Sequence, residues 1–279
     1  APAYLPKEGG RYDLPIAVAL LAASEQLTPH NLDTYELVGE LALTGGLRGV
    51  PGAISSATEA IRAGRRIIVA KENAAEVGLI HGEGCLIAAH LQAVCAFLEG
   101  KHDLDRPSSA DFTPNALADD LSDVIGQEQG KRGLELTAAG GHNLLLIGPP
   151  GTGKTMLASR LRGLLPPLSN DEALESAAIL SLIHSDTIQK QWKQRPFRSP
   201  HHSASLTAMV GGGSIPAPGE ISLAHNGILF LDELPEFERR TLDALREPIE
   251  SGQIHLSRTR AKITYPARFQ LIAAMNPSP

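Results

Sequence analysis

The chain carries the segment Gly148-Pro149-Pro150-Gly151-Thr152-Gly153-Lys154-Thr155 directly after an apolar run and before a segment with helical spacing. A glycine, four residues and then Gly-Lys-Thr form the pattern of a phosphate-binding loop. Glycines let the backbone approach phosphates closely with inward N–H groups, and the helix that follows offers its positive end to the same anion. We predict that residues 148–155 bind ATP, with Lys154 at the β- and γ-phosphates and Thr155 on Mg²⁺.

Two further apolar runs end in polar side chains. The run 227–231 ends in Asp232 and Glu233, and the run 271–275 ends in Asn276. Acids at the end of a buried strand are costly unless they have a role. We expect Asp232 to hold Mg²⁺ or its water, and Glu233 to polarise the attacking water. Asn276 is expected to orient water near the γ-phosphate, so that Lys154, Glu233 and Asn276 are the predicted catalytic residues.

Apolar strands alternate with helices around these motifs. Helices are predicted over 127–139 and 154–164, and strands over 143–147, 227–231 and 268–274. Repeated alternation with short apolar strands predicts a parallel sheet in a three-layer α/β domain.

The sequence predicts a second, smaller α/β unit before residue 100. Helical spacing over 14–26 and 54–63 alternates with strand-like runs over 37–43 and 66–70, and a strand and a helix follow over 85–99. Residues 100–120 are rich in Asp, Pro, Ser and Asn. We therefore expect one domain over 1–100, a linker over 101–120 and the phosphate-loop domain over 121–279. Because the chain begins and ends abruptly, both domains are expected to be incomplete.

Composition narrows the class of protein. A formal net charge of −6 argues against a surface covered with basic charge for nucleic acid, although it leaves room for a local basic groove. The two cysteines, Cys85 and Cys95, are too few for a disulfide scaffold and fit a reduced, cytoplasmic protein. Since no run of 18 or more apolar residues occurs, we expect no membrane span.

Basic residues alternate with other residues between 253 and 265. Arg258, Arg260 and Lys262 would share one face if this segment were a single strand. We predict that they contact the phosphates of DNA, and the alternative is a solvated hairpin face without a ligand.

A second polar cluster contains Arg195, Arg198, His201 and His202. Adjacent histidines rarely bind one ion, and no cysteine lies nearby to complete a zinc site. We expect a polar loop or a nucleic-acid contact at this cluster rather than a metal site.

These motifs together resemble the AAA+ ATPases, and within them the magnesium-chelatase-like branch. The resemblance covers about residues 121–279 and lies in Asp123–Glu128, Gly148–Thr155, Phe197–His202, Gly219–His225, Asp232-Glu233 and Ala273–Asn276. With the first domain included, the chain is similar to the YifB/ComM group. That resemblance implies a hexameric ring and, for the ComM branch, a DNA helicase that promotes branch migration during recombination in natural transformation (competence). It also implies an arginine finger and a helical lid after residue 279.

The first domain resembles the Lon protease domain. The match lies in Pro6–Gly9, Leu14–Ala17, Gly39–Leu43 and Ala70–Asn73. Lon uses a Ser–Lys dyad in which the lysine activates the serine hydroxyl. The serine position falls on Arg11 and the lysine position on Ile54, so we expect a scaffold or partner-binding domain without protease activity.

Three functions remain open. The first is an ATP-driven translocase on single-stranded or branched DNA. The second is a magnesium-chelatase-like ATPase that remodels a protein partner for metal insertion into a tetrapyrrole. The third is an adaptor without enzymatic output of its own, in which the ATPase acts as a switch.

Overall fold

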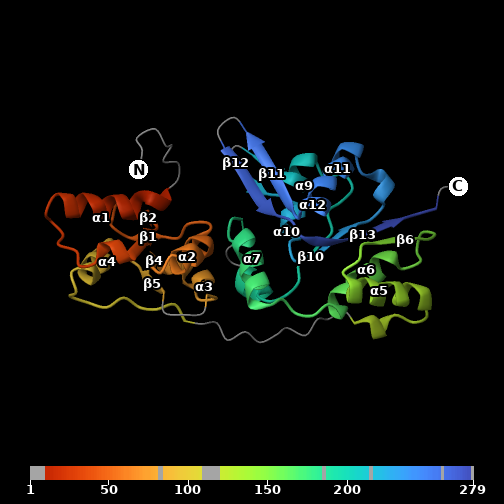
Figure 1. The fold of residues 1–279 in the computed structure, drawn as a ribbon, viewed down its shortest axis with the longest axis horizontal. Coiled ribbons are helices and arrows are strands. Elements are labelled where there is room, and N and C mark those ends of the chain that lie inside the picture. Colours follow the sequence, from red (N-terminus) through yellow and green to blue (C-terminus); the bar gives the residue numbers. More distant parts are fainter. Residues whose placement is uncertain are drawn as a thin grey trace. The chain divides into compact units, whose positions relative to one another are not determined.

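The computed structural model describes residues 10–80, 84–108, 120–183, 187–213, 216–258 and 261–277 (Figure 1). In the hairpin it describes the side chains of residues 253–256 and 262–266. The chain divides into two compact units. Unit 1 comprises residues 1–112 and 180–190, and unit 2 comprises residues 113–179 and 191–279.

Unit 1 is built on a parallel three-stranded sheet in the order β1-β4-β5. Its elements are η1 (Gly10–Tyr12), α1 (Asp13–Ala23), η2 (Leu32–Thr34), β1 (Tyr35–Val38), β2 (Glu40–Leu41), β3 (Leu47–Arg48), α2 (Ala53–Arg62), β4 (Arg66–Ala70), η3 (Lys71–Asn73), α3 (Ala74–Val77), β5 (Cys85–Ala88) and α4 (Leu91–Leu98). The predicted strand 66–70 has the bounds of β4, and the predicted helices lie within a few residues of α1, α2 and α4.

Helices cover both faces of the unit 1 sheet. Successive residues of a strand point to opposite faces. Ile68 of β4 packs into a cluster with α1 and α4, whereas Ile67 packs into a cluster with α2 and α3. Both side chains are fully buried, as expected for a central parallel strand.

From residue 121 the chain forms the elements of unit 2, apart from the segment 180–190. They are η4 (Leu121–Asp123), α5 (Glu128–Gly140), β6 (Leu144–Ile147), α6 (Lys154–Leu164), α7 (Asn170–Leu180), β7 (Phe197–Arg198), α9 (Leu206–Val210), β8 (Gly211–Gly212), β9 (Ala217–Pro218), α10 (Glu220–Leu223), β10 (Gly227–Leu231), η6 (Leu234–Glu236), α11 (Arg239–Asp243), α12 (Arg246–Ser251), β11 (Gln253–Arg258), β12 (Ala261–Pro266) and β13 (Phe269–Met275). The short helix α8 (Ile188–Gln191) lies mostly in the segment 180–190 of unit 1.

The central sheet of unit 2 has four parallel strands in the order β6-β13-β10-β7. Phe230 of β10 packs into a cluster with α5 and α6, and its neighbour Leu229 packs into a cluster with α9, α10 and the β11–β12 hairpin. Figure 1 shows these elements on opposite sides of the sheet. The three-layer α/β fold predicted from the sequence is confirmed.

The direction of the strands positions the candidate site. All four strands are parallel, so their carboxyl ends lie at one edge of the sheet. The residues that come directly after β6, β7, β10 and β13 therefore meet there.

Among the helices of the described ranges, none is both long and apolar enough to span a bilayer.

Candidate active site

The loop between β6 and α6 has the conformation that its glycines allow. Gly151 and Gly153 have φ values of 77° and 79°, in the left-handed region that residues with a Cβ rarely adopt. Thr152 Oγ1 donates a hydrogen bond to Pro149 O at 2.9 Å, and the Gly148 N–H donates to Met275 O at 3.3 Å. The loop thus opens at the carboxyl edge of the sheet, with the N-terminus of α6 at its end.

Lys154 lies at the mouth of this loop. Its Nζ donates hydrogen bonds to Gly148 O at 2.7 Å, to Pro149 O at 3.0 Å and to Asn276 Oδ1 at 3.0 Å. All three acceptors are uncharged, so they hold the ammonium group without neutralising it. Asn276 follows β13, and the structure thus brings together two of the predicted catalytic residues.

Thr155 and Asp232 form the second contact of the site. Thr155 Oγ1 donates a hydrogen bond to Asp232 Oδ2 at 2.6 Å, and Asp232 Oδ1 accepts one from the Glu233 N–H at 3.0 Å. A hydroxyl and a carboxylate are hard oxygen donors of the kind that Mg²⁺ prefers, with water and phosphate oxygens as its other ligands. The two side chains therefore fit the predicted metal role.

Glu233 has an unusual backbone. Its φ of 53° lies in the left-handed region, which is uncommon for a residue other than glycine and concentrates at functional sites. The side chain is about half exposed, and Oε2 lies 3.3 Å from His202 Nδ1. His202 follows β7, which is the parallel neighbour of β10. The sequence did not point to this contact, because a strand of two residues has no recognisable periodicity.

The segment before α5 lies against the phosphate loop. Gln127 Nε2 donates a hydrogen bond to Thr152 O at 2.7 Å. Val124 is buried, whereas Ile125 is 95% exposed. An exposed isoleucine next to a phosphate loop offers an apolar contact for the base of a nucleotide.

Two of the three residues predicted to contact DNA lie on the β11–β12 hairpin, in an arrangement that differs from the expected one. Arg258 is the last residue of β11 and pairs with Ala261, while Lys262 lies on the return strand and pairs with Ser257. Arg258 and Lys262 therefore lie on different strands and do not alternate along one. Lys262 is exposed. Arg260 and the side chain of Arg258 lie outside the described part of the chain.

The positions expected for a Ser–Lys dyad lie in unit 1. Arg11 Nη2 donates a hydrogen bond to Ser56 Oγ at 3.0 Å, and Ile54 is fully buried at the start of α2. The matching segment Pro6–Gly9 lies outside the described residues. A guanidinium and a buried aliphatic group cannot act as nucleophile and amine base.

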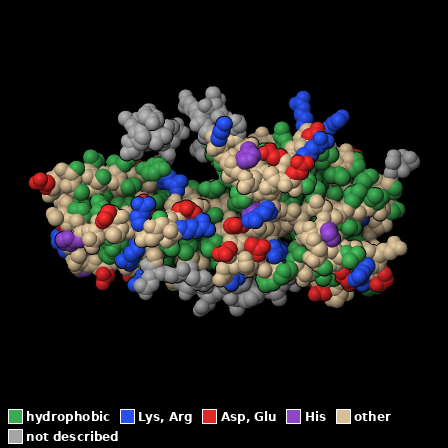
Figure 2. All heavy atoms as spheres, viewed as in Figure 1, with side chains coloured by type: hydrophobic (Ala, Val, Ile, Leu, Met, Phe, Trp, Pro, Cys, Tyr) green, Lys and Arg blue, Asp and Glu red, His purple; other side chains and the backbone are tan. Residues whose placement is uncertain are grey.

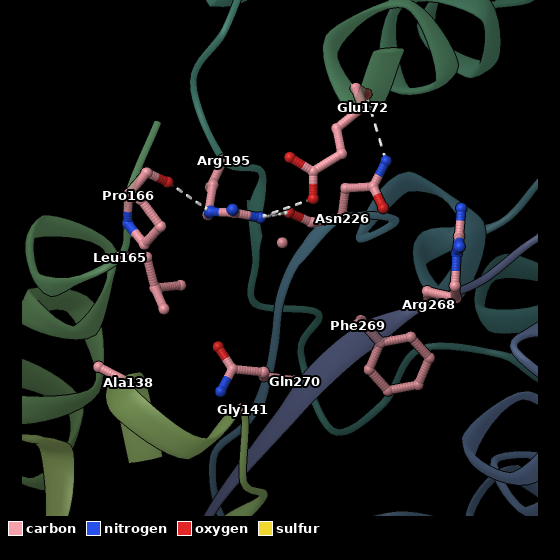
Figure 3. A pocket seen from close by; sticks show the side chains of 11 residues that line it. Ala138, Gly141, Leu165, Pro166, Glu172, Arg195, Asn226, Arg268, Phe269 and Gln270 are labelled. Atoms are coloured by element: carbon pink, nitrogen blue, oxygen red, sulfur yellow. Dashed lines mark hydrogen bonds and ion pairs between the residues drawn. The ribbon is translucent and has the colours of Figure 1, made fainter. Parts of the chain in front are cut away.

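A cavity of about 440 Å³ lies at the other edge of the unit 2 sheet (Figure 3). It is lined at the starts of β10 and β13 by Gly227 and Phe269. Arg195 bridges its wall, since Nε donates to Pro166 O at 2.7 Å and Nη1 to Asn226 O at 2.8 Å. Ligands of open α/β sheets bind at the carboxyl ends of strands, so this cavity is distinct from the site at Lys154.

Comparison with known proteins gives matches along most of the chain. The family described as magnesium chelatase, subunit ChlI, matches residues 120–279, and that described as subunit ChlI of Mg-chelatase matches residues 1–73. The chain is 85% identical over 279 residues to YifB of Escherichia coli (strain K12), covering 100% of this chain and 55% of that protein.

Two further relatives carry more descriptive names. The chain is 57% identical over 286 residues to competence protein ComM of Haemophilus influenzae, covering 100% of this chain and 56% of that protein. It is 29% identical over 179 residues to the magnesium-chelatase 38 kDa subunit of Cereibacter sphaeroides, covering 56% of this chain and 52% of that protein. The chain thus spans about half the length of the curated relatives it matches.

Proposed function

The chain belongs to the magnesium chelatase subunit ChlI family, and on this premise we propose that it contains the ATPase core of a AAA+ motor. One observation carries the proposal. At the carboxyl edge of one parallel sheet, Lys154 contacts Asn276 at 3.0 Å and Thr155 contacts Asp232 at 2.6 Å. A phosphate loop with these partners is suited to binding and cleaving a nucleoside triphosphate with Mg²⁺.

Each residue of the site has a role in this proposal. The backbone of residues 148–153 surrounds the phosphates, Lys154 contacts the β- and γ-phosphates, and Thr155 and Asp232 hold Mg²⁺. When bound, the ion neutralises charge on the phosphates. Glu233 accepts a proton from the attacking water, and Asn276 orients that water.

For the whole protein we propose a DNA helicase or translocase that promotes branch migration during recombination in natural transformation. The 57% identity to a protein named competence protein ComM supports this proposal. The exposed Lys262 on the hairpin adds a cation suited to a DNA phosphate. The proposal includes a hexameric ring with the hairpins facing its channel. This ring acts on single-stranded or branched DNA in the cytoplasm.

A second candidate is an ATPase that remodels a protein partner. Its support is the 29% identity of part of the chain to a magnesium-chelatase 38 kDa subunit. The similarity to YifB and ComM covers the full chain, whereas this one covers 56% of it, so we favour the DNA motor. In both candidates unit 1 serves as a scaffold or a partner-binding domain without protease activity.

The test uses the full-length protein. ATP hydrolysis is measured with and without forked and four-way DNA, beside a Lys154→Ala variant. We expect hydrolysis that depends on Lys154 and that DNA stimulates. Absence of Lys154-dependent hydrolysis would overturn the ATPase proposal, and hydrolysis that DNA leaves unchanged would favour the protein-remodelling candidate.

A further inference from the structure

The cavity at the starts of β10 and β13 has the size of a ligand site. Its volume is about 440 Å³. Pockets for small organic ligands measure roughly 300–1,000 Å³. The cavity lies at the edge of the sheet opposite to Lys154, because β10 and β13 begin there and end near the phosphate loop. The two sites are therefore separate, and both can be filled at once.

One wall of the cavity is apolar. It is formed by Ala138 of α5 and by Leu165 and Pro166, which follow α6. Ala138 and Leu165 pack against the core between the sheet and the helices α5 and α6. Packing thus fixes a surface that is suited to the flat face of a ring.

Two polar side chains lie on opposite sides of the cavity (Figure 3). The amide nitrogen of Gln270 donates hydrogen bonds to Thr137 O at 2.9 Å and to His142 O at 3.3 Å. These bonds fix the amide, and its oxygen is directed to the side of Arg195 (Figure 3). Nε and Nη1 of Arg195 are held by main-chain oxygens, whereas Nη2 has no hydrogen-bond partner among the described residues. The cavity therefore offers one fixed acceptor and one fixed donor.

The charged groups around the cavity are paired with one another. Nη1 of Arg195 lies 3.7 Å from Oε1 of Glu172, and Nη2 of Arg268 lies 2.9 Å from Oε2 of Glu175. An anionic ligand would compete with these carboxylates for the arginines, and a cationic ligand would compete with the arginines. The pairing favours an uncharged ligand that is recognised by directed hydrogen bonds.

We propose that this cavity binds an uncharged planar ring with a carbonyl acceptor on one edge and N–H donors on another, the pattern of a guanine base. Guanine presents the acceptors O6 and N7 on one side and an amino donor on the other. Its O6 accepts from Arg195 Nη2, its N–H groups donate to Gln270 Oε1, and one face lies against Leu165 and Ala138. The base belongs either to a free nucleoside or to single-stranded DNA. The inference does not depend on ATP hydrolysis at Lys154.

The test measures binding of guanosine to the full-length protein by calorimetry, with ADP and Mg²⁺ filling the phosphate loop. Adenosine is the matched ligand, because adenine places an amino donor where guanine has its carbonyl and has no N–H donor for Gln270. We expect guanosine to bind about tenfold or more tightly than adenosine, since a mismatched polar group leaves buried partners unpaired.

A matched pair of variants locates the binding site. Ala138→Leu fills the cavity beside its apolar wall, whereas Ala139→Leu adds the same atoms at the next, exposed position of α5. We expect Ala138→Leu to weaken guanosine binding about tenfold and Ala139→Leu to leave it as in the wild type. An oligothymidylate with one guanine displaces guanosine if the ring is a DNA base, and leaves it bound if the ligand is a free nucleoside.

Several results would overturn the inference. They are an absence of guanosine binding to the wild type, equal affinities for guanosine and adenosine, and an unchanged affinity in Ala138→Leu. Loss of guanosine binding in Lys154→Ala would place the ligand at the phosphate loop and would overturn it as well. A protein that binds guanosine but shows no Lys154-dependent hydrolysis would refute the ATPase proposal alone, so the two proposals fail separately.

Discussion

Lys154 Nζ donates a hydrogen bond to Asn276 Oδ1 over 3.0 Å, although the two residues are 122 positions apart in the sequence. They meet because β6 and β13 are parallel neighbours, with Ile147 opposite Met275, so the residues that follow both strands leave the sheet together. The amide acceptor leaves the positive charge of the ammonium available for phosphate. We therefore expect the charge at position 276 to govern the affinity of the proposed nucleotide site.

Asn276→Asp and Asn276→Ala test that relationship. The aspartate pairs with Lys154 and repels the γ-phosphate, so we expect ATP to bind about tenfold more weakly. The alanine removes one acceptor and leaves Lys154 Nζ with the carbonyls of Gly148 and Pro149. We therefore expect affinity to stay within about threefold while kcat falls with the loss of water orientation. Titration with a fluorescent ATP analogue gives the affinities and steady-state hydrolysis gives kcat. Equal affinities of the two variants would contradict the role of charge.

Thr155→Ala and Thr155→Ser test the metal role. The alanine removes the hydroxyl that contacts Asp232 Oδ2 at 2.6 Å. We expect hydrolysis to fall on the order of 100-fold, since Mg²⁺ loses an oxygen ligand, whereas the serine keeps the hydroxyl and stays within about fivefold. Hydrolysis is measured against Mg²⁺ concentration for both variants. An unchanged Mg²⁺ dependence in Thr155→Ala would place the metal away from this hydroxyl.

Unit 1 contains a buried carboxyl group. Glu76 is 2% exposed, and its Oε1 accepts a hydrogen bond from Asn73 Nδ2 at 2.6 Å. Asn73 in turn bonds both backbone groups of Val50, each at 3.0 Å. Burial raises the pKa of Glu76 to about 7, and the hydrogen bonds from Asn73 and the Ala53 N–H only partly oppose it. Glu76 Oε2 has no hydrogen-bond partner among the described atoms.

This raised pKa predicts a loss of stability with rising pH. Above its ordinary pKa of 4.5 the unfolded chain releases the Glu76 proton, while the folded state holds it up to about pH 7. The contribution of protonated Glu76 to the free energy of unfolding is complete below about pH 4.5 and is lost by about pH 7. The loss is ~1.4 kcal/mol per pH unit and up to ~3 kcal/mol in total. Glu76→Gln keeps an acceptor for Asn73 without an ionisable group, so it is expected to be more stable than the wild type at pH 8.

Urea unfolding at pH 5 and pH 8 checks this prediction, with Glu76→Ala as the second variant. The alanine leaves a cavity and removes one of the two acceptors of Asn73 Nδ2, so it is expected to destabilise at both pH values, by about 2–4 kcal/mol. A wild-type pH dependence that persists in Glu76→Gln would show that another group is responsible.

The central strands of the site could be predicted from the sequence. The run Gly227–Leu231 is apolar throughout and ends in two acids, and β10 has the predicted bounds. Long apolar runs with defined ends leave few alternative interpretations. With the phosphate loop before α6 and Asn276 after β13, three of the four parallel strands that form the site follow from such runs.

The features of the fold and the site that could not be predicted from the sequence depend on tertiary contacts. The strand β7 has two residues, so its pairing with β10, and with it the approach of His202 to Glu233, has no sequence pattern. The predicted strand 37–43 is divided at Gly39, whose N–H donates to Arg11 O and whose carbonyl accepts from the Leu14 N–H. These bonds to the start of α1 replace those of a continuous strand.

The last prediction concerns DNA binding by the β11–β12 hairpin. Arg258 ends β11 and the exposed Lys262 lies on β12. Each phosphate contact that is lost lowers the slope of log affinity against log salt by about 0.9. We expect Arg258→Ala combined with Lys262→Ala to weaken binding of forked DNA and to lower that slope by about two units. Fluorescence anisotropy between about 50 and 200 mM salt measures both quantities.

A second double variant shows whether the position of the charges matters. Basic and acidic side chains lie side by side over α11 and α12 (Figure 2). Arg239 and Arg246 lie 3.9 Å and 3.3 Å from Asp243, so their charges are already paired. Arg239→Ala with Arg246→Ala removes the same net charge as the hairpin variant, and we expect it to leave the salt slope nearly unchanged. If both double variants lower the slope equally, DNA responds to net charge alone, and the hairpin has no specific part in binding.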